Sequence, residues 1–284
     1  MEHTLEIAST LGFCGGVQRA LQKFQELRAD TPAGVPVYVL HELVHNRTVT
    51  GQMQSQGAVF VNAPEEVPEG ATCLIGAHGV GPRTERKLRE RAARVVDATC
   101  PIVKKVQFAA SQIVGNEELI LAGAQGHPEA VGILEHAGTT RHYLVSSVAD
   151  VMALTEVFHP VMLCQTTLNH LVADELFAAL RRRFPTAGRG GSICHASSER
   201  QAAVEELVRR VDLLLVIGSP HSSNANRLKE IGLRAGLPSF LVEGPEQLSA
   251  VLADYGRIGL SVGASTPDDQ IGRTADAVRK LLGI

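Results

Sequence analysis

Three cysteine-containing segments of similar pattern recur at nearly equal intervals along this chain of 284 residues. In each, a cysteine follows a short strand-like or loop segment and precedes a helical pattern; the cysteines are Cys14, Cys100 and Cys194. A repeat of this kind indicates recurring supersecondary units. We therefore expect three similar modules, with a glycine-rich linker at 186–192. Their expected ranges are 1–98, 99–193 and 194–284. An alternative is that the N-terminal strand joins the third module.

Apolar runs of strand length alternate with longer stretches of helical periodicity, which predicts an α/β fold built from βα units. Runs rich in β-branched residues are typical of parallel strands with helices on both faces. The expected strands lie at 35–40, 73–77, 119–123, 161–165, 212–218 and 257–263. The clearest expected helices lie at 19–29, 83–94, 167–184, 198–211 and 273–283.

Composition excludes several classes of protein. A net charge of −3 with no basic block disfavours a nucleic-acid partner. The start of the sequence has no signal-peptide pattern, and no apolar run approaches membrane-spanning length, so we expect a cytoplasmic protein with no membrane partner. Five cysteines are an odd number in such a chain, which favours metal binding or catalysis over a disulfide framework.

The three repeated cysteines suit one inorganic centre. Thiolate sulfur is a preferred ligand for iron–sulfur clusters and also binds zinc. Three ligands for four irons leave one iron open to substrate, which is typical of a catalytic metal. Cys73 and Cys164 lie inside apolar strands, and we expect them in the core. The sequence has no CxxC motif, but a zinc site remains open as the alternative.

Polar residues also recur after the predicted strands. Counting 27 or 28 residues from each cysteine reaches His41, His127 and Ser222. Later in each module, a second polar residue follows a predicted strand: His78, Thr166 and Ser265. Loops beyond the carboxyl ends of parallel strands bind ligands, and imidazole, hydroxyl and backbone N–H groups suit a small polyanion such as a diphosphate. Eight further histidines are expected to be ordinary surface or core residues: His3, His45, His136, His142, His159, His170, His195 and His221.

Glu129 stands at the start of a predicted helix, two residues after His127. A carboxylate there stabilises the helix dipole. The alternative is a proton donor in a closed pocket, acting through the hydroxyl group of Thr166.

At these residues the sequence closely resembles the LytB family of 4-hydroxy-3-methylbut-2-enyl diphosphate reductases. The resemblance covers almost the whole chain, in the order GFCGGV, HELVHN, AHGV, DATCPIV, GHPEA, QTTL, SSNANRL and GASTPD. It implies three α/β modules in a pseudo-threefold trefoil around a central [4Fe–4S] cluster. Cys14, Cys100 and Cys194 then take the ligand positions, with one iron left for the substrate's hydroxyl oxygen.

The resemblance also implies the reaction and its remaining residues. The family removes the hydroxyl group of (E)-4-hydroxy-3-methylbut-2-enyl diphosphate with two electrons and two protons, giving isopentenyl and dimethylallyl diphosphates in the last step of the non-mevalonate isoprenoid pathway. Electrons are expected from an external carrier of the ferredoxin or flavodoxin type. Thr166 and Glu129 fall where the family handles the hydroxyl group and delivers protons. The diphosphate positions correspond to His41, His78, His127, Ser222, Ser223, Asn224 and Ser265.

Some residues depart from the family pattern, although none is a presumed cluster ligand or diphosphate contact. Gln18 stands in place of an acid, Gln107 in place of a histidine, and Cys164 in place of a threonine. The segments His195–Ser198 and Pro220–His221 also differ. Two other functions stay open: a zinc-dependent or Cys/His hydrolase of phosphorylated substrates, and a non-catalytic protein that binds a cluster or a diphosphate. Metal content separates the first from a reductase, and turnover separates the second.

Overall fold

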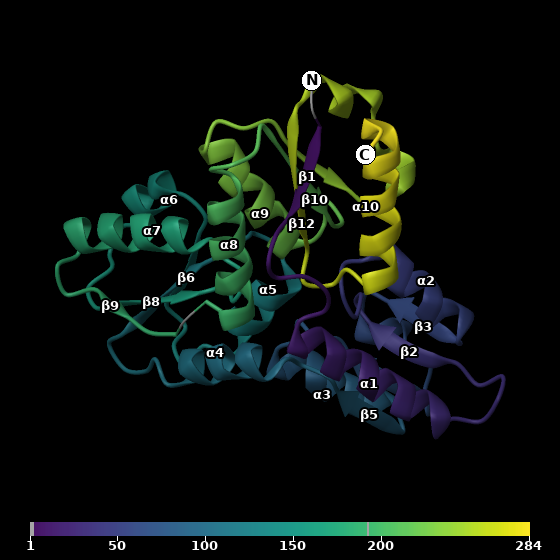
Figure 1. The fold of residues 1–284 in the computed structure, drawn as a ribbon. Coiled ribbons are helices and arrows are strands. Elements are labelled where there is room, and N and C mark those ends of the chain that lie inside the picture. The colour runs from purple at the N-terminus through teal and green to yellow at the C-terminus, as the bar shows by residue number, and fades with distance from the viewer. Residues whose placement is uncertain (1–2, 192) are drawn as a thin grey trace. The chain divides into compact units, whose positions relative to one another are not determined.

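A computed structural model describes residues 3–191 and 193–284, so the last residue of the predicted linker at 186–192 lies outside the described residues. The described chain forms three four-stranded sheets in which every strand pair is parallel, with helices packed against them (Figure 1). The predicted α/β class with three similar modules is confirmed. All six predicted strands are present within a residue or two of their expected bounds.

The sheet of the first module has the strand order β3-β2-β4-β5. Leu40, Cys73 and Ile75 of its strands pack against Leu88 of helix α3. The predicted helix at 83–94 is shorter in the structure and ends at Arg91, because Arg94 already pairs with Thr72 as the first residue of β5. The elements are α1 (Gly15–Ala29), β2 (Val37–Leu40), α2 (Arg47–Ser55), β3 (Ala58–Val61), η1 (Pro64–Glu66), β4 (Thr72–Ile75), α3 (Pro82–Arg91) and β5 (Arg94–Asp97).

The second sheet has the order β7-β6-β8-β9 and is covered on both faces. Ile120 and Leu176 belong to the core on the α6–α7 face, and Leu121 and Ile133 to the core on the α4–α5 face. This two-sided burial explains why β8 and residues 119–122 of β6 are apolar. The elements are α4 (Pro101–Ser111), β6 (Glu118–Ala122), α5 (Pro128–Glu135), β7 (His142–Val145), α6 (Val148–Ala153), β8 (Pro160–Cys164), α7 (His170–Arg183) and β9 (Gly188–Arg189).

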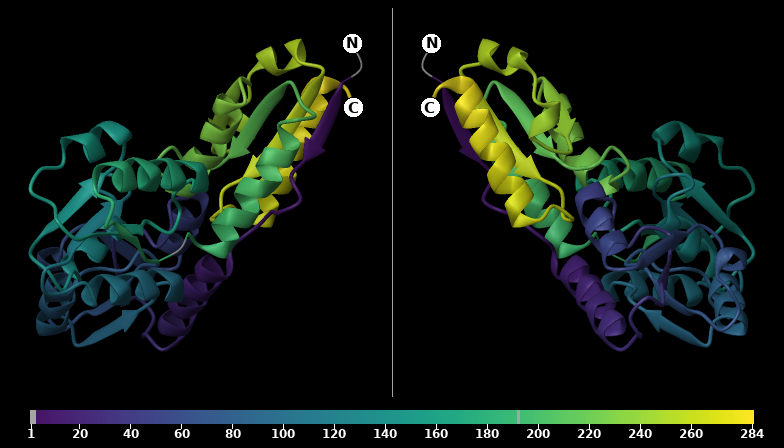
Figure 2. Two further views of the ribbon diagram at one scale, coloured as in Figure 1. Left: turned by 90° about the vertical axis from the view of Figure 1, so that its left-hand side faces the viewer. Right: turned by 90° about the vertical axis from the view of Figure 1, so that its right-hand side faces the viewer.

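The third sheet has the order β1-β12-β10-β11, so the N-terminal strand pairs with the last strand of the chain. Helix α10 covers one face, where Ile258 and Val278 meet, while α8 and α9 cover the other face. In Figures 1 and 2, β1 and α10 lie side by side. The elements are β1 (Thr4–Ile7), α8 (His195–Leu207), β10 (Leu213–Ile217), α9 (Ser223–Arg234), β11 (Ser239–Val242), η2 (Pro245–Gln247), η3 (Ala250–Asp254), β12 (Arg257–Val262) and α10 (Asp268–Leu282).

Internal contacts divide the chain into two compact units, which we call unit 1 and unit 2. Unit 1 comprises Met1–Val17, Val44–Gln52 and His195–Ile284 and holds the third sheet. Unit 2 comprises Gln18–Leu43 and Met53–Cys194 and holds the other two sheets. The modules 1–98, 99–193 and 194–284 remain our proposal for the repeating segments. No helix in the described part of the chain has the length and apolar character needed to cross a bilayer.

Candidate functional site

The backbone holds the three repeated cysteines in the same way. Each cysteine donates its N–H to a carbonyl oxygen two residues beyond the end of a strand, namely β12, β4 or β8. The chain is therefore brought to each sheet at an equivalent place, which residue spacing alone does not require. The hydrogen bonds are Cys14 to Ala264 (3.0 Å), Cys100 to Ala77 (3.0 Å) and Cys194 to Thr166 (2.9 Å).

The same three cysteines directly precede the helices α1, α4 and α8. None of the three forms a disulfide within the described chain, and each is partly exposed. Cys73 and Cys164 differ, because burial in the sheets raises the pKa of each thiol to about 11. The sequence-based placement of Cys73 and Cys164 in the core is confirmed.

Counting from strand ends changes one equivalence proposed from the sequence. His127 and Ser222 each lie five residues after the last residue of a strand, β6 and β10. The residue five after the end of β2 is His45, not His41. Counting from the cysteines missed this correspondence because the segments between cysteine and strand differ in length among the modules.

The hydrogen bonds of His41 support the same correction. His41 directly follows β2, and its N–H donates to the carbonyl oxygen of Val61 at the end of β3 (2.7 Å). Gly123 and Gly218 make the corresponding bonds in the other two sheets, at 3.0 and 2.9 Å. His41 is therefore the counterpart of two glycines. It also lines a cavity of about 120 Å³ beside the loops that carry His78 and His127, and so stays a candidate for substrate contact.

His45 lies next to two polar residues of unit 1 that define its surroundings. The hydroxyl group of Ser265 donates to the backbone carbonyl of His45 across 3.4 Å. The following residue, Asn46, accepts from the N–H of Val49 and donates to the side chain of Gln270 at 3.0 Å, which anchors the start of α2. From the sequence alone, His45 is expected to be an ordinary surface or core residue. Its position four residues after His41 in HELVHN was the available signal.

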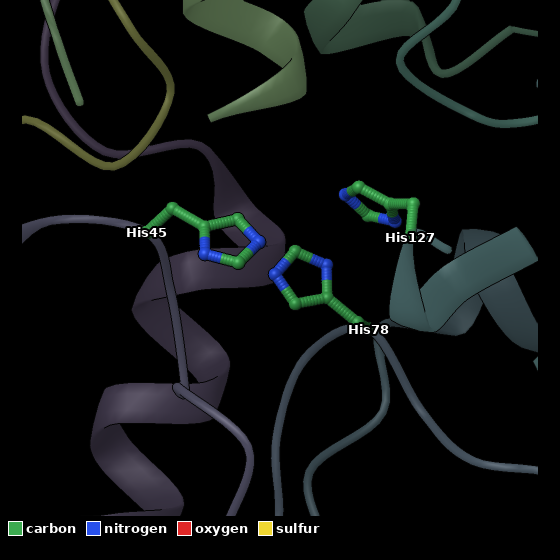
Figure 3. Close-up of side chains that lie close together, drawn as sticks. All are labelled: His45, His78 and His127. Atoms are coloured by element: carbon green, nitrogen blue, oxygen red, sulfur yellow. The ribbon is translucent and has the colours of Figure 1, made fainter. Parts of the chain in front are cut away.

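Two predicted histidines of unit 2 contact each other. The rings of His78 and His127 pack edge to face with centroids 5.1 Å apart (Figure 3, which also labels His45 of unit 1). The Nδ1 atom of His127 accepts a hydrogen bond from the N–H of Glu129 at 3.1 Å and so caps α5. This bond selects the tautomer with the proton on Nε2, leaving that nitrogen as the donor.

Glu129 is buried, with 2% of its surface exposed. Its Oε1 atom accepts a hydrogen bond from the backbone N–H of Thr166 at 2.6 Å. Burial raises the pKa of Glu129 to about 7, although hydrogen bonds from Thr166 act in the opposite direction. A carboxyl group with this pKa exchanges a proton near neutral pH, which a dipole-stabilising surface carboxylate does not do.

Thr166 also supplies the carbonyl oxygen that accepts from Cys194, so one residue connects this cysteine with Glu129. By strand counting, however, the counterpart of His78 and Ser265 in the second module is Thr167. The sequence-based choice of Thr166 for this position therefore differs by one residue from the position that strand counting gives.

The remaining predicted polar residues gather at the start of α9 in unit 1. Ser222 caps this helix by accepting from the N–H of Ala225 at 3.3 Å. Asn224 accepts from the N–H of Ala264 at 2.9 Å, while the carbonyl of Ala264 accepts from Cys14. Ser223 is the first residue of α9. This end of the helix presents backbone N–H groups and hydroxyl groups suited to an anion.

Two of the residues that depart from the family pattern differ in burial. Gln107 is buried, and its Nε2 atom lies near the carbonyl oxygen of Val80 (3.4 Å) in the loop that follows His78. It thus acts on the position of that loop. The side chain of His195, in contrast, is 87% exposed and lies 3.2 Å from Glu199.

Comparison with known proteins gives consistent matches along the chain. A family model described as "LytB protein" matches residues 5–279. A 4-hydroxy-3-methylbut-2-enyl diphosphate reductase of Xylella fastidiosa (strain M12) is 42% identical over 272 residues, covering 92% of this chain and 85% of the relative. The enzyme of that name from Ralstonia nicotianae is 39% identical over 281 residues, covering 97% of this chain and 86% of its own.

Solved structures agree with these sequence matches. The E-1-hydroxy-2-methyl-but-2-enyl-4-diphosphate reductase of Plasmodium falciparum superposes with a TM-score of 0.92 at 29% identity, covering 98% of this chain and 89% of that chain. A second structure, described as the terminal enzyme of the non-mevalonate pathway, has a TM-score of 0.67 at 30% identity and covers 97% and 99%. The family model and the relatives extend over nearly the whole sequence, and on this basis the chain belongs to the LytB family.

Proposed function

We propose that this protein reduces (E)-4-hydroxy-3-methylbut-2-enyl diphosphate to isopentenyl and dimethylallyl diphosphates, the last step of the non-mevalonate isoprenoid pathway. Two electrons and two protons replace the C–O bond of the substrate's hydroxyl group with a C–H bond and release water. The observation that carries the proposal is the equivalent backbone attachment of three accessible cysteines, each at the start of a helix.

The donor set fits an iron–sulfur cluster. Cys14, Cys100 and Cys194 each offer a sulfur atom directly before a helix, and they would hold a [4Fe–4S] cluster with one open iron. When bound, such a cluster supplies single electrons and a Lewis-acidic iron for the hydroxyl oxygen. We assign the electron supply to an external carrier of the ferredoxin or flavodoxin type, and a cytoplasmic location remains a prediction from the sequence.

The protein's own groups bind the diphosphate and move protons. Glu129, protonated in part at neutral pH, delivers a proton toward the departing hydroxyl group, with the Thr166 hydroxyl as relay. The Nε2–H of His127 and the N-terminus of α9 donate hydrogen bonds to the diphosphate oxygens. We add His45 to this binding set because of its strand-end position and its contact with Ser265. The proposed contacts are His41, His45, His78, His127, Thr166, Ser222, Ser223, Asn224 and Ser265.

Anaerobic metal analysis with electron paramagnetic resonance tests this function. We expect a brown protein that contains iron and sulfide and whose cluster signal changes when the allylic diphosphate is added. Cys14→Ser, Cys100→Ser and Cys194→Ser should each abolish the cluster, whereas Cys73→Ser and Cys164→Ser serve as matched controls and should retain it. A colourless protein with one zinc per chain favours the hydrolase, and a stable cluster in Cys100→Ser contradicts the ligand assignment.

A further inference from the structure

A cavity of about 560 Å³ opens on unit 2, outside the set of residues assigned to the substrate. It is formed by α1, by the end of β5 and by the first two turns of α4. Both helices can be followed by their labels in Figure 1. Its lining residues are Arg19, Lys23, Asp97, Thr99, Pro101, Lys104, Lys105 and Phe108.

Positive charge dominates this cavity although the chain as a whole carries a net charge of −3. Four cationic side chains line it, against the single carboxylate of Asp97. Lys104 forms an ion pair with that carboxylate, and the ammonium group of Lys23 donates to the backbone carbonyl of Asp97. Arg19 and Lys105 are exposed and form no ion pair within the described chain. Their charges are therefore available to an incoming molecule.

Phe108 lies beside these cations with 66% of its surface exposed. An exposed aromatic side chain costs hydration free energy, and aromatic and arginine side chains are enriched at protein–protein contacts. A small anion needs only the positive charges, so Phe108 favours a protein partner. A neighbouring cavity of about 260 Å³ shares Phe108 and Lys104 with the first. It is also lined by the acidic residue Glu85, which forms an ion pair with Arg89.

The position of the cavity indicates a partner that delivers electrons. Pro101 lines it and directly follows Cys100, which the proposed function makes a ligand of the redox centre. A partner seated here would therefore contact the residue adjoining that ligand. Complementary charge brings redox partners together quickly, and small interfaces let them separate after each electron transfer.

We propose that the surface formed by Arg19, Lys23, Lys104, Lys105 and Phe108 is the docking site for a small acidic electron-carrier protein. This inference rests on the proposed function, because a docking site of this kind has a purpose only next to a redox centre. Attraction between the cations and acidic groups of the carrier orients it, and Phe108 supplies the apolar contact.

The test measures equilibrium binding of an acidic ferredoxin, and separately of a flavodoxin, to the cluster-loaded protein at several salt concentrations. We expect Arg19→Glu combined with Lys105→Glu to weaken binding about tenfold or more at low salt and to flatten its salt dependence. Phe108→Ala should weaken binding while leaving the salt dependence unchanged. Arg182→Glu combined with Arg209→Glu is the matched control: it makes the same change in net charge at exposed positions elsewhere, and it should bind like wild type.

Turnover with a chemically reduced viologen separates this proposal from the function on which it rests. The charge-reversed protein should keep wild-type turnover with the viologen and lose turnover with the carrier. Equal carrier binding by wild type and the charge-reversed protein overturns the docking site, as does an equal loss in the control. Binding of a DNA duplex or inorganic phosphate at this surface, without carrier binding, also overturns it. Failure of wild type to reduce the allylic diphosphate with the viologen instead refutes the proposed function.

Discussion

Glu129 holds its carboxyl group where water does not reach it, and the consequence is a pKa of about 7. Because burial disfavours the charged form, the group is protonated below pH 7 and loses its proton as the pH rises through that value. Only the protonated form can donate. Activity that depends on this donor should therefore decline on the alkaline side of neutrality.

Replacing Glu129 with glutamine tests this role. Glu129→Gln keeps the size of the side chain but removes its acidic proton, so we expect kcat to fall about 10²–10⁴-fold with a much smaller change in KM. The decline of kcat with pH near 7 should also disappear from the residual activity. Steady-state kinetics with an artificial reductant from pH 6 to 9 measures both effects. An increase in KM at unchanged kcat would indicate a binding role instead.

The two histidines of HELVHN can be separated by parallel substitutions. We expect His45→Ala to raise KM for the diphosphate substrate by about tenfold or more, because it removes a donor to a charged oxygen. His41→Ala should have the smaller effect, since His41 occupies the strand-end position that glycine fills in the other two sheets. If His41→Ala is the more damaging change, the equivalence drawn from strand ends does not describe the binding site.

At the scale of elements, the proposed functional residues lie in loops and at helix N-termini rather than within strands. The loop after β4 carries His78 and then turns at Gly79, whose φ is +71°. A Cβ atom at Gly79 would lie 2.7 Å from Thr99 and 2.9 Å from the side chain of Gln107. Gln107, one of the residues that depart from the family pattern, thus packs directly against this turn.

This close packing predicts the effect of Gly79→Ala. The left-handed conformation costs an alanine about 1–2 kcal/mol, and overpacking against Thr99 and Gln107 adds about 1–3 kcal/mol. Displacement of His78 should also raise KM for the substrate. Gly34→Ala is the control, because Gly34 has a φ of +79° and open space around its Cβ position. It should lose only the conformational part of the unfolding free energy and none of the activity. Denaturant unfolding and kinetics measure these differences, and equal losses in the two variants would contradict the packing argument.

Element by element, the sequence predicted the central strands and the long helices well because their apolar patterns are strong. It described the short edges less completely. Strand β9, for example, has two residues, Gly188 and Arg189, within a segment expected as a linker. Their strand character comes from hydrogen bonds to β8, which no local pattern encodes.

On the scale of the whole molecule, the proposed cluster ligands are separated by 86 and 94 residues, and Cys14 belongs to a different compact unit from Cys100 and Cys194. A centre bound by such distant residues restricts the unfolded chain and contributes its binding free energy to folding. Stability should therefore depend on the metal.

Anaerobic removal of iron with a chelator should lower the Tm by at least about 5 °C, since several kcal/mol of binding free energy are lost and each kcal/mol shifts the Tm of a protein this large by about 2 °C. Differential scanning calorimetry before and after chelation measures the change. Cys100→Ser is the control and should show no further decrease with the chelator. An unchanged Tm in wild type would show that the cysteines hold no stabilising centre.

The sequence by itself determined the α/β class and the threefold recurrence of a cysteine before a helix, because apolar periodicity and the spacing of rare residues are properties of the linear chain. Only the tertiary structure decided that His45 is the counterpart of His127 and Ser222, and that burial beside Thr166 brings the pKa of Glu129 close to neutrality. Both depend on hydrogen bonds and on exclusion of water by residues far away in the sequence, and no local pattern contains them.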